Sequence, residues 1–437
     1  MKIGLVTGEY APMQGGVGDF TREVARAMVA LGHAVHVITG RRPQVADVSS
    51  QDSGQDGGQD GGIHVERVIE GWSWRCWRAL SDESKRLGLQ VVNLQFQTAA
   101  YNMHPAINLL PLARRIHPLI RWPRLLPIVV TFHDLRAPYL FPKAGPLRRQ
   151  VVLALARHAD AAIVTNQEDA LDLQSALSHA LSATRPQPSA IRHLPSALSH
   201  PPSAIRHPPS AISQIPIGSN IAPCLPKGYN RDEWRSRYGV RPDEMLVGYF
   251  GFFHPLKGGE SLIRALAELV AEGRAVRLLH IGGRSGSSDA DTNAAYAARV
   301  ESLARELGVA DRMAATGFVT PEQVTASFYA TDVVALPYVE GASFRHGTFH
   351  AALAHGRAIV TTRPPVPLEE LCDGENVLLV SPGDSHALAE GVRRTIEDTA
   401  LRARLEHGAT DLSQLFTWDR IAAQTVRVFE QAIGRQQ

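Results

Sequence analysis

Short apolar runs rich in Val, Ile and Leu recur along the chain and alternate with longer amphipathic segments. Segments 17–32 and 259–273 place their apolar residues on one face of a helix, as a 3.6-residue period requires. Apolar runs between such helices are typical of parallel strands that are buried on both faces. The pattern predicts an α/β protein with strands at 2–7, 33–39, 64–69, 91–96, 127–133, 161–166, 245–251, 276–282, 332–338, 358–362 and 376–381.

The predicted strands fall into two series, with a change near residues 224–227. A strand–helix–strand series of this kind folds into a doubly wound sheet covered by helices on both faces. We therefore expect two doubly wound domains. In such domains ligands bind at the carboxyl ends of the strands.

Two segments interrupt this alternation. Residues 51–62 are a glycine-rich repeat of four, and a later repeat of seven carries a proline in every unit. A proline in each repeat costs a helix about 3 kcal/mol, so the second repeat is no coiled coil. The composition predicts disordered, low-complexity insertions near 49–62 and 178–213, and neither should carry chemistry.

Composition limits the classes of function. The chain has 437 residues, 44% apolar and 20% charged, with a formal net charge of +2. This balance argues against nucleic-acid binding, which calls for a strongly basic face. The start MKIGLVTGEY favours a buried strand over a signal peptide, and no apolar stretch reaches the roughly 18–20 residues of a membrane span. Three distant cysteines suit a reducing compartment, so we expect a cytoplasmic protein.

One part of the chain is strongly basic. Residues 104–157 contain nine Lys and Arg residues and a single acid, Asp134. Trp122, Leu125 and Leu126 lie among the arginines, so the stretch is suited to peripheral contact with the anionic inner face of a membrane. The alternative is an ordinary solvated basic helix and loop.

Three predicted strand ends carry residues suited to phosphates and sugars. Gly15, Gly16 and Gly18 follow the first strand and open a helix, whose amino end attracts phosphate; the alternative is a tight turn. His133 ends a later strand and would face a ligand, unless it is structural. Lys257 stands between a strand and a helix, where it is placed to meet a diphosphate or is an exposed loop lysine.

The order of the motifs resembles the retaining glycosyltransferases of family 4, which have the GT-B fold. The resemblance rests on the glycine pair, HD after the fifth strand, GF…KG, TGFVTPEQV, ATDVVALP, LAHGRAIVTT and FTWDRIAAQTVRVFEQAI. It implies two Rossmann-like domains that face a central cleft. The first, 1–222, would bind the acceptor and the second, 223–415, the nucleotide sugar, with a helix over 416–437 crossing back to the first domain.

The resemblance also implies which residues meet the substrates. His133 would lie near the reacting sugar and Lys257 against the donor diphosphate. Glu340 matches the first of two family glutamates, the one that touches the donor sugar. The nucleotide sugar would further contact Gly15, Gly16, Val17, Phe318, Ser343, Gly347 and Thr348.

Two positions depart from the family pattern. The second glutamate, which holds the nucleotide ribose, is replaced by Thr348 when counted from Glu340, or by Ala351 when aligned from the glycine that follows. Phe252 stands where the family commonly has an arginine beside the lysine.

Arg345 is our candidate for the missing arginine. With the Ser343 and Thr348 hydroxyls and the Gly347 amide, it would form a diphosphate cradle at the start of a helix. The alternative is that Arg345 pairs with Glu340 and only braces the loop.

The implied reaction needs positive charge where the diphosphate departs. Lys257, Arg345 and the amides near Gly16 would supply it, so we expect no metal and no cofactor besides the nucleotide-sugar substrate. The resemblance implies retention of anomeric configuration.

The sequence indicates the acceptor less specifically than the donor, and we expect a glycan or a lipid-linked sugar. Gln95, Gln97 and Tyr101 are candidates to recognise it, with buried structural glutamines as the alternative. Two other functions stay open. A non-catalytic nucleotide-sugar binder or partner subunit is favoured by the missing glutamate, and a dinucleotide-dependent oxidoreductase is disfavoured because G-x-G-x-x-G is absent.

Overall fold

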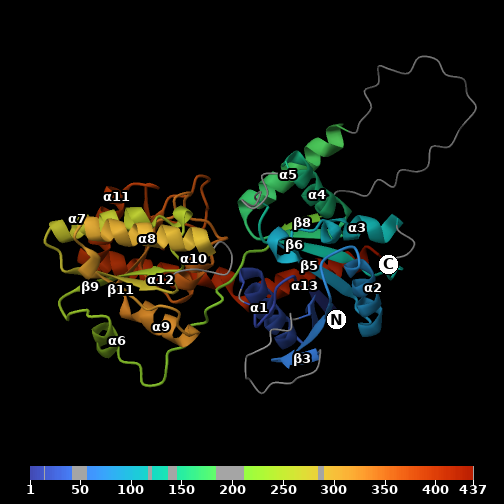
Figure 1. Cartoon of the computed structure of the whole chain (residues 1–437), viewed down its shortest axis with the longest axis horizontal. Coiled ribbons are helices and arrows are strands. Elements are labelled where there is room, and N and C mark those ends of the chain that lie inside the picture. The colour runs from blue at the N-terminus through green and yellow to red at the C-terminus, as the bar shows by residue number, and fades with distance from the viewer. Residues whose placement is uncertain are drawn as a thin grey trace, which may run out of the picture. The chain divides into compact units, whose positions relative to one another are not determined.

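The computed structural model describes residues 1–13, 15–41, 57–116, 121–135, 145–183, 211–283 and 290–436. The chain divides into two compact units. Unit 1 comprises Met1–Pro216 with Ile421–Gln437, and unit 2 comprises Ile217–Arg420. Each unit has its own sheet with helices on both faces (Figure 1). The predicted α/β class with two doubly wound domains is confirmed.

The described part of unit 1 contains an eight-stranded sheet in the order β3-β4-β2-β1-β5-β6-β7-β8. All neighbours pair in parallel except β3 and β4. The chain order reverses between β1 and β5, where ligands of doubly wound sheets bind. The elements are β1 (Lys2–Val6), α1 (Gly16–Ala30), β2 (Ala34–Gly40), β3 (Gly57–Asp60), β4 (Ile63–Ile69), α2 (Cys76–Leu87), β5 (Val91–Phe96), η1 (Thr98–Tyr101), α3 (Ala106–Ile116), β6 (Ile128–Phe132), α4 (Gly145–His158), β7 (Ala161–Val164), α5 (Gln167–Ala183) and β8 (Ala211–Gln214).

Strand β3 lies inside a segment predicted to be disordered. It is the edge strand of the sheet and pairs with β4, and the Asp60 carboxylate accepts hydrogen bonds from Arg22 at 2.6 Å and Arg26 at 3.1 Å. The prediction for 49–62 is therefore wrong at its carboxyl end. An open sheet edge offers unpaired backbone groups to any extended segment, and this partner is invisible in the composition of the repeat.

The second predicted insertion, 178–213, is also shorter than expected. Helix α5 continues to Ala183, and β8 starts at Ala211 and pairs in parallel with β7. The prediction is wrong at both ends of the segment. Residues 42–56 and 184–210 lie outside the described residues.

The C-terminal helix α13 (Trp418–Gly434) begins in unit 2, and from Ile421 its residues belong to unit 1. Ile421 and Phe429, both in the part of the helix that belongs to unit 1, are fully buried. The predicted return of this helix to the first domain is confirmed.

Unit 2 contains a parallel sheet in the order β11-β10-β9-β12-β13-β14. The direction of the order reverses between β9 and β12, which is the second switch point. The elements are α6 (Arg231–Arg237), β9 (Met245–Phe250), η3 (Pro255–Lys257), α7 (Gly259–Ala271), β10 (Val276–Ile281), α8 (Ala290–Glu306), η4 (Ala310–Arg312), β11 (Met313–Ala315), α9 (Pro321–Ala330), β12 (Val333–Leu336), α10 (Gly347–Ala354), β13 (Ile359–Thr362), β14 (Leu378–Val380), α11 (Ser385–Glu397), α12 (Thr399–Ser413) and η5 (Gln414–Phe416).

Alternate residues of these strands face opposite cores, as the two-residue period of a strand requires. Val247 and Tyr249 pack with α7, α8 and α11, whereas Leu246 packs with α6, α9 and α10. Figure 1 shows α7 and α8 on one side of β9 and α9 on the other. The sheet is therefore covered by helices on both faces.

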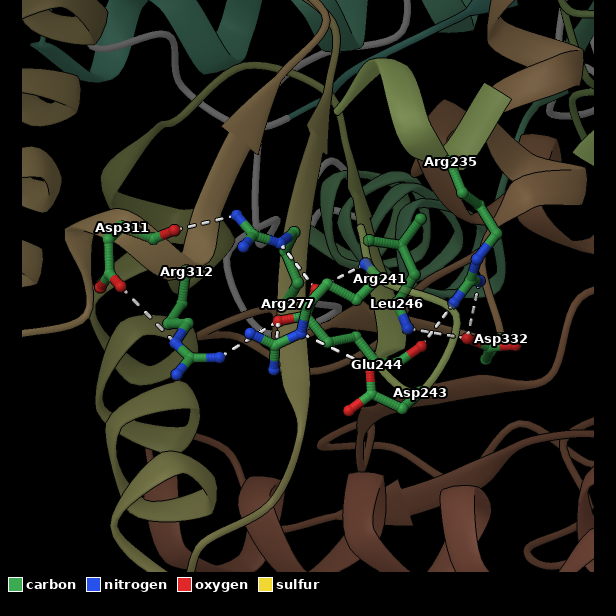
Figure 2. A network of polar contacts seen from close by, with 9 residues as sticks. All are labelled: Arg235, Arg241, Asp243, Glu244, Leu246, Arg277, Asp311, Arg312 and Asp332. Carbon is green, nitrogen blue, oxygen red and sulfur yellow. Dashed lines mark hydrogen bonds and ion pairs between the residues drawn. The ribbon is translucent and has the colours of Figure 1, made fainter. Parts of the chain in front are cut away.

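The amino ends of the unit 2 strands carry a network of ion pairs (Figure 2). Buried Glu244 pairs with Arg277 at 3.2 Å and Arg312 at 3.1 Å. Asp332, just before β12, pairs with Arg235 at 3.0 Å and accepts from the Leu246 amide at 2.7 Å. These contacts tie helix α6 and the starts of the four strands β9, β10, β11 and β12 together at this edge.

Candidate active site

Lys257 lies at the carboxyl end of β9, in the turn that leads into α7. Gly251 and Gly258 flank this turn with φ of +113° and +69°, a region that favours glycine. A Cβ at position 258 would lie 1.9 Å from the carbonyl oxygen of Pro337. The Val339 amide donates to the Leu256 carbonyl at 2.9 Å. These contacts fix the turn against the loop that follows β12.

The Lys257 ammonium meets hydroxyls rather than acids. Its Nζ donates to Thr348 Oγ1 at 3.3 Å and lies 5.7 Å from the centre of the Tyr338 ring. The Tyr338 hydroxyl is also 2.6 Å from Thr348 Oγ1. Burial lowers the pKa of Lys257 to about 8, and among the described residues no carboxylate pairs with it. The site therefore holds a desolvated cation whose charge is unbalanced.

The predicted cradle residues lie around the start of α10. Gly347 is exposed and is the first residue of the helix, and no side chain among the described residues caps this end. Ser343 is buried, Arg345 is half-buried and Glu340 is exposed. Thr348 is the cradle residue that contacts Lys257.

Sequence reasoning missed two aromatic residues of this site. The rings of His346 and Tyr338 stack with their centres 3.9 Å apart. Tyr338 is buried and its hydroxyl contacts Thr348, so it forms one wall beside the ammonium. Their position could have indicated them, because both lie in or directly after the end of the predicted strand 332–338, beside the candidate residues Glu340 and Arg345.

Two phenylalanines near the same edge are exposed. Phe318 follows Gly317, which forms an isolated bridge with Gly282 at the end of β10, and 75% of its surface is accessible. Phe252, in the turn before Lys257, is 40% exposed. An exposed aromatic face at a strand end is suited to stacking on a flat ring such as a nucleobase.

In unit 1, His133 follows β6 at the carboxyl edge of the sheet. Its Nε2 lies 2.8 Å from Gln95 Oε1, and its ring meets Phe20 of α1 edge to face at 4.7 Å. Burial lowers the pKa of His133 to about 3, so the ring is neutral at physiological pH. The structure thus brings the predicted histidine next to helix α1, which carries the predicted glycine loop.

The glycine loop already holds an anion supplied by the chain. Glu9 Oε1 accepts a hydrogen bond from the Val17 amide at 3.1 Å. A Cβ at Gly15 would lie 2.3 Å from Glu9 Oε2, so the carboxylate explains the glycine at that position. Burial raises the pKa of Glu9, although the Val17 and Gly18 amides oppose the shift. A phosphate could reach the Val17 amide only if Glu9 moved away.

Two of the residues expected to recognise the acceptor have structural contacts instead. Tyr101 is fully buried, and its hydroxyl lies 2.9 Å from the carbonyl oxygens of Val6 and Gln95. The Gln95 side chain is buried against His133. The expectation is corrected for these two residues, because their polar atoms are used inside the unit. Gln97 is half-buried.

The basic stretch keeps two of its three apolar residues named above, Trp122 and Leu126, in the core, whereas Leu125 and also Ile116 are exposed. Trp122 and Leu126 belong to the unit 1 core, and the Trp122 indole donates to the Leu126 carbonyl at 3.0 Å. Arg114 is buried and pairs with Asp160. Of the three residues named above only Leu125, 64% exposed, remains free for a membrane surface, so membrane contact through this apolar set is not supported. Residues 117–120 and 136–144 lie outside the described structure.

The fold is that of the GT-B glycosyltransferases. Residues 15–178 match the family model described as glycosyl transferase 4-like domain, and residues 244–398 match that described as glycosyl transferases group 1. The two matches follow the two units and together cover most of the chain. The chain belongs to this glycosyltransferase family.

Related proteins and solved structures agree with this assignment. A D-inositol 3-phosphate glycosyltransferase of a Nocardioides species is 33% identical over 216 residues, 46% of this chain and 45% of that protein. One from Xylanimonas cellulosilytica is 34% identical over 206 residues, 47% and 46% of the two chains. The matches thus span about half the length of these relatives.

Two solved structures share the fold over the whole chain. Sucrose-phosphate synthase from Thermosynechococcus elongatus has a TM-score of 0.73 at 20% identity, with 100% of both chains covered. HepE from Anabaena, in complex with UDP-glucose, has a TM-score of 0.66 at 19% identity and covers 99% of this chain and 100% of its own. Within the described residues, no helix has the length and apolar character needed to cross a membrane.

Proposed function

We propose that the protein transfers a sugar from a nucleotide-sugar donor to a glycan or lipid-linked acceptor with retention of anomeric configuration. The observation that carries this proposal is the Lys257 ammonium, which is desolvated and bonded to Thr348, with no acid to balance it in the described part of the chain. Lys257 is half-buried, and a charge shielded from water without a partner is costly, so a site that keeps one is suited to an anionic ligand. A nucleoside diphosphate supplies that anion, and UDP-glucose occupies the structurally similar HepE.

In the reaction, negative charge builds up on the departing diphosphate while the sugar carbon gains oxocarbenium character. Lys257 and Arg345, with the uncapped amides at the start of α10, would meet this charge. Because these cations supply the stabilisation, the proposed reaction needs no metal. We expect a chelator to leave turnover unchanged.

The remaining residues orient the donor. Glu340, exposed before α10, would accept hydrogen bonds from the sugar hydroxyls. Phe318 would stack on the base, and Ser343, Gly347 and Thr348 would surround the phosphates. Neutral His133 would hydrogen-bond the sugar without adding charge. On the acceptor side, the relatives are D-inositol 3-phosphate glycosyltransferases, so an inositol phosphate is a useful first compound to test beside glycans and lipid-linked sugars. The proposed setting is the cytoplasm, where nucleotide sugars are available.

The donor is tested by measuring thermal unfolding with UDP-, GDP-, ADP- and dTDP-sugars. A ligand at about 100 times its dissociation constant adds roughly 2.7 kcal/mol to the folded state, which is easily seen. We expect one base to give a clear shift in wild type and a smaller one in Lys257→Ala. Lys227→Ala, which removes the exposed second lysine of unit 2, should match wild type. No shift with any donor would overturn the proposal.

The same donors separate an enzyme from a binding protein. An active glycosyltransferase hydrolyses its donor slowly when no acceptor is present, because water replaces the acceptor. Release of the free nucleotide, followed over hours, should therefore occur with the donor that gave the shift. A thermal shift without any release or transfer would support the non-catalytic binder instead.

A further inference from the structure

A chain of side-chain hydrogen bonds runs through the unit 1 core to His133. It joins the neighbouring strands β5 and β6, which pair at Asn93 and Val129. Asn93 and Gln95 are 0% and 1% exposed, and Thr131 is 2% exposed. Two buried amides side by side are expensive unless each donor and acceptor has a partner. This row of side-chain hydrogen bonds is therefore a specific part of the core structure.

Which atoms donate and which accept in this row of hydrogen bonds follows from the contacts of Asn93. Asn93 Nδ2 faces the backbone carbonyl of Val129 at 3.3 Å, and a carbonyl can only accept. The Nδ2 also lies 3.0 Å from Thr131 Oγ1, but the same hydroxyl lies 3.3 Å from Asn93 Oδ1, to which it can donate, so it is the Val129 carbonyl that makes the assignment. The amide nitrogen of Asn93 is thereby assigned to this side. Its oxygen, Oδ1, must point toward Gln95.

The same reasoning assigns the donor and acceptor atoms of Gln95 and then of His133. Asn93 Oδ1 accepts, so Gln95 turns its Nε2 toward it, and this pair is in hydrogen-bond contact. Gln95 Oε1 is then the atom that faces His133, 2.8 Å from Nε2. An amide oxygen only accepts, so His133 must carry its proton on Nε2. Each step leaves one choice, because a reversed amide would place two donors or two acceptors together.

We propose that Gln95 is a positioning residue that holds His133 as the Nε2–H tautomer and so leaves Nδ1 as the hydrogen-bond acceptor of the ring. Phe20 fixes the ring plane from the side of α1. The neutral ring is consistent with this role, because a protonated ring would have no acceptor. The contribution of Gln95 is thus to choose which nitrogen meets a ligand, without itself touching one.

The consequence for transfer rests on the proposed function. With Nδ1 as acceptor, His133 would receive a hydrogen bond from a hydroxyl of the donor sugar or of the acceptor, and would repel a group that offers only an acceptor. Loss of the tautomer would misplace that hydroxyl, and misplacement costs turnover more than affinity.

The test reads the tautomer directly in the full-length protein. Nitrogen-15 labelled histidine gives different long-range proton–nitrogen patterns for the Nε2–H and Nδ1–H forms, and His133→Gln identifies the signal of His133. We expect wild type to show the Nε2–H form alone. In Gln95→Met, which keeps the length but removes both polar atoms, we expect a mixture of tautomers. The Nδ1–H form in wild type would overturn the proposal whether or not the protein transfers sugar.

A matched control separates positioning from a merely structural role. Tyr101→Phe removes a buried hydroxyl bonded to the Gln95 carbonyl, but it leaves the Gln95 side chain in place. It should lower the melting temperature and keep the Nε2–H pattern. With the donor found by thermal shift, Gln95→Met should lower kcat about tenfold with donor KM within about twofold. An unchanged tautomer in Gln95→Met, or equal effects of both variants on kcat, would contradict the proposal. Absence of transfer in wild type would count against the proposed function alone.

Discussion

The two edges of the unit 2 sheet treat charge in opposite ways. At the amino ends of the strands, Glu244 is surrounded by Arg241, Arg277 and Arg312, so its charge is met within the protein (Figure 2). At the carboxyl ends, Lys257 has hydroxyl and aromatic neighbours and no acid among the described residues. Both edges hold desolvated charge, but only one of them balances it.

This difference separates stability from function. Removing one member of a closed network leaves its partners buried and unpaired, which destabilises the fold. Removing an unbalanced cation relieves a desolvation cost and should leave the fold as stable or more so. The comparison therefore predicts opposite effects of charge removal at the two edges.

The largest effect is expected for Lys257→Ala. Turnover should fall by about 10²–10³-fold, as when one preorganised donor is removed from an oxyanion site, with a smaller loss of donor affinity. The melting temperature should stay the same or rise. Steady-state kinetics and a melting curve on the same sample check both parts, with Lys227→Ala as the control. Turnover within about twofold of wild type would remove Lys257 from the site.

The opposite edge should respond in stability. Glu244→Gln should lower the free energy of unfolding by about 3 kcal/mol, because Arg241, Arg277 and Arg312 lose the buried acid that they share. Donor affinity of the folded protein should be unchanged. Asp243→Asn is the matched control, since that side chain is 70% exposed and should cost less than about 0.5 kcal/mol. Urea unfolding measures both, and similar losses for the two variants would contradict the contrast between the edges.

Arg345 should give a smaller catalytic effect than Lys257. Arg345→Ala is expected to lower turnover about thirtyfold, and Arg345→Lys about tenfold, because lysine keeps the charge but loses two-pronged geometry. Phe252→Arg in the Arg345→Ala background should restore part of the rate. If Arg345 instead braces Glu340, then Arg345→Ala and Glu340→Ala would lower the melting temperature together and leave donor titrations unchanged.

The smallest effect is a pH dependence of donor binding. The pKa of Lys257 is lowered to about 8, and the diphosphate needs the charged form. Affinity should be greatest below pH 8 and fall about tenfold between pH 7 and pH 9. Donor titrations across this range measure it. In Lys257→Arg the decline should vanish, and a decline that persists would assign it to another group.

Much of the architecture was readable from the sequence. Buried parallel strands need continuous apolar runs, and their helices need an apolar stripe, so both patterns survive in the chain as written. The residue after each run must lie at a strand end, which is how Lys257, His133 and the stretch from Tyr338 to Thr348 could be marked as candidates.

Other features depend on partners far apart in the sequence. The role of Gln95 needed the pairing of β5 with β6, and strand β3 needed the open edge of β4. Residue type and strand-end position made the first a candidate for the acceptor, with a buried structural glutamine as the alternative, and composition assigned the second to disorder. A polar side chain is defined by what it contacts, and composition carries no information on contacts.

The sequence by itself determined the two doubly wound domains and the strand ends at which ligands would bind, because these follow from local periodicity. Only the tertiary structure decided how each charge there is met. Thr348 reaches Lys257 across 91 residues, whereas Glu9 turns back onto the Val17 amide that the sequence had offered to a phosphate. Both outcomes depend on burial, because water would otherwise satisfy each group and no fixed partner would be needed.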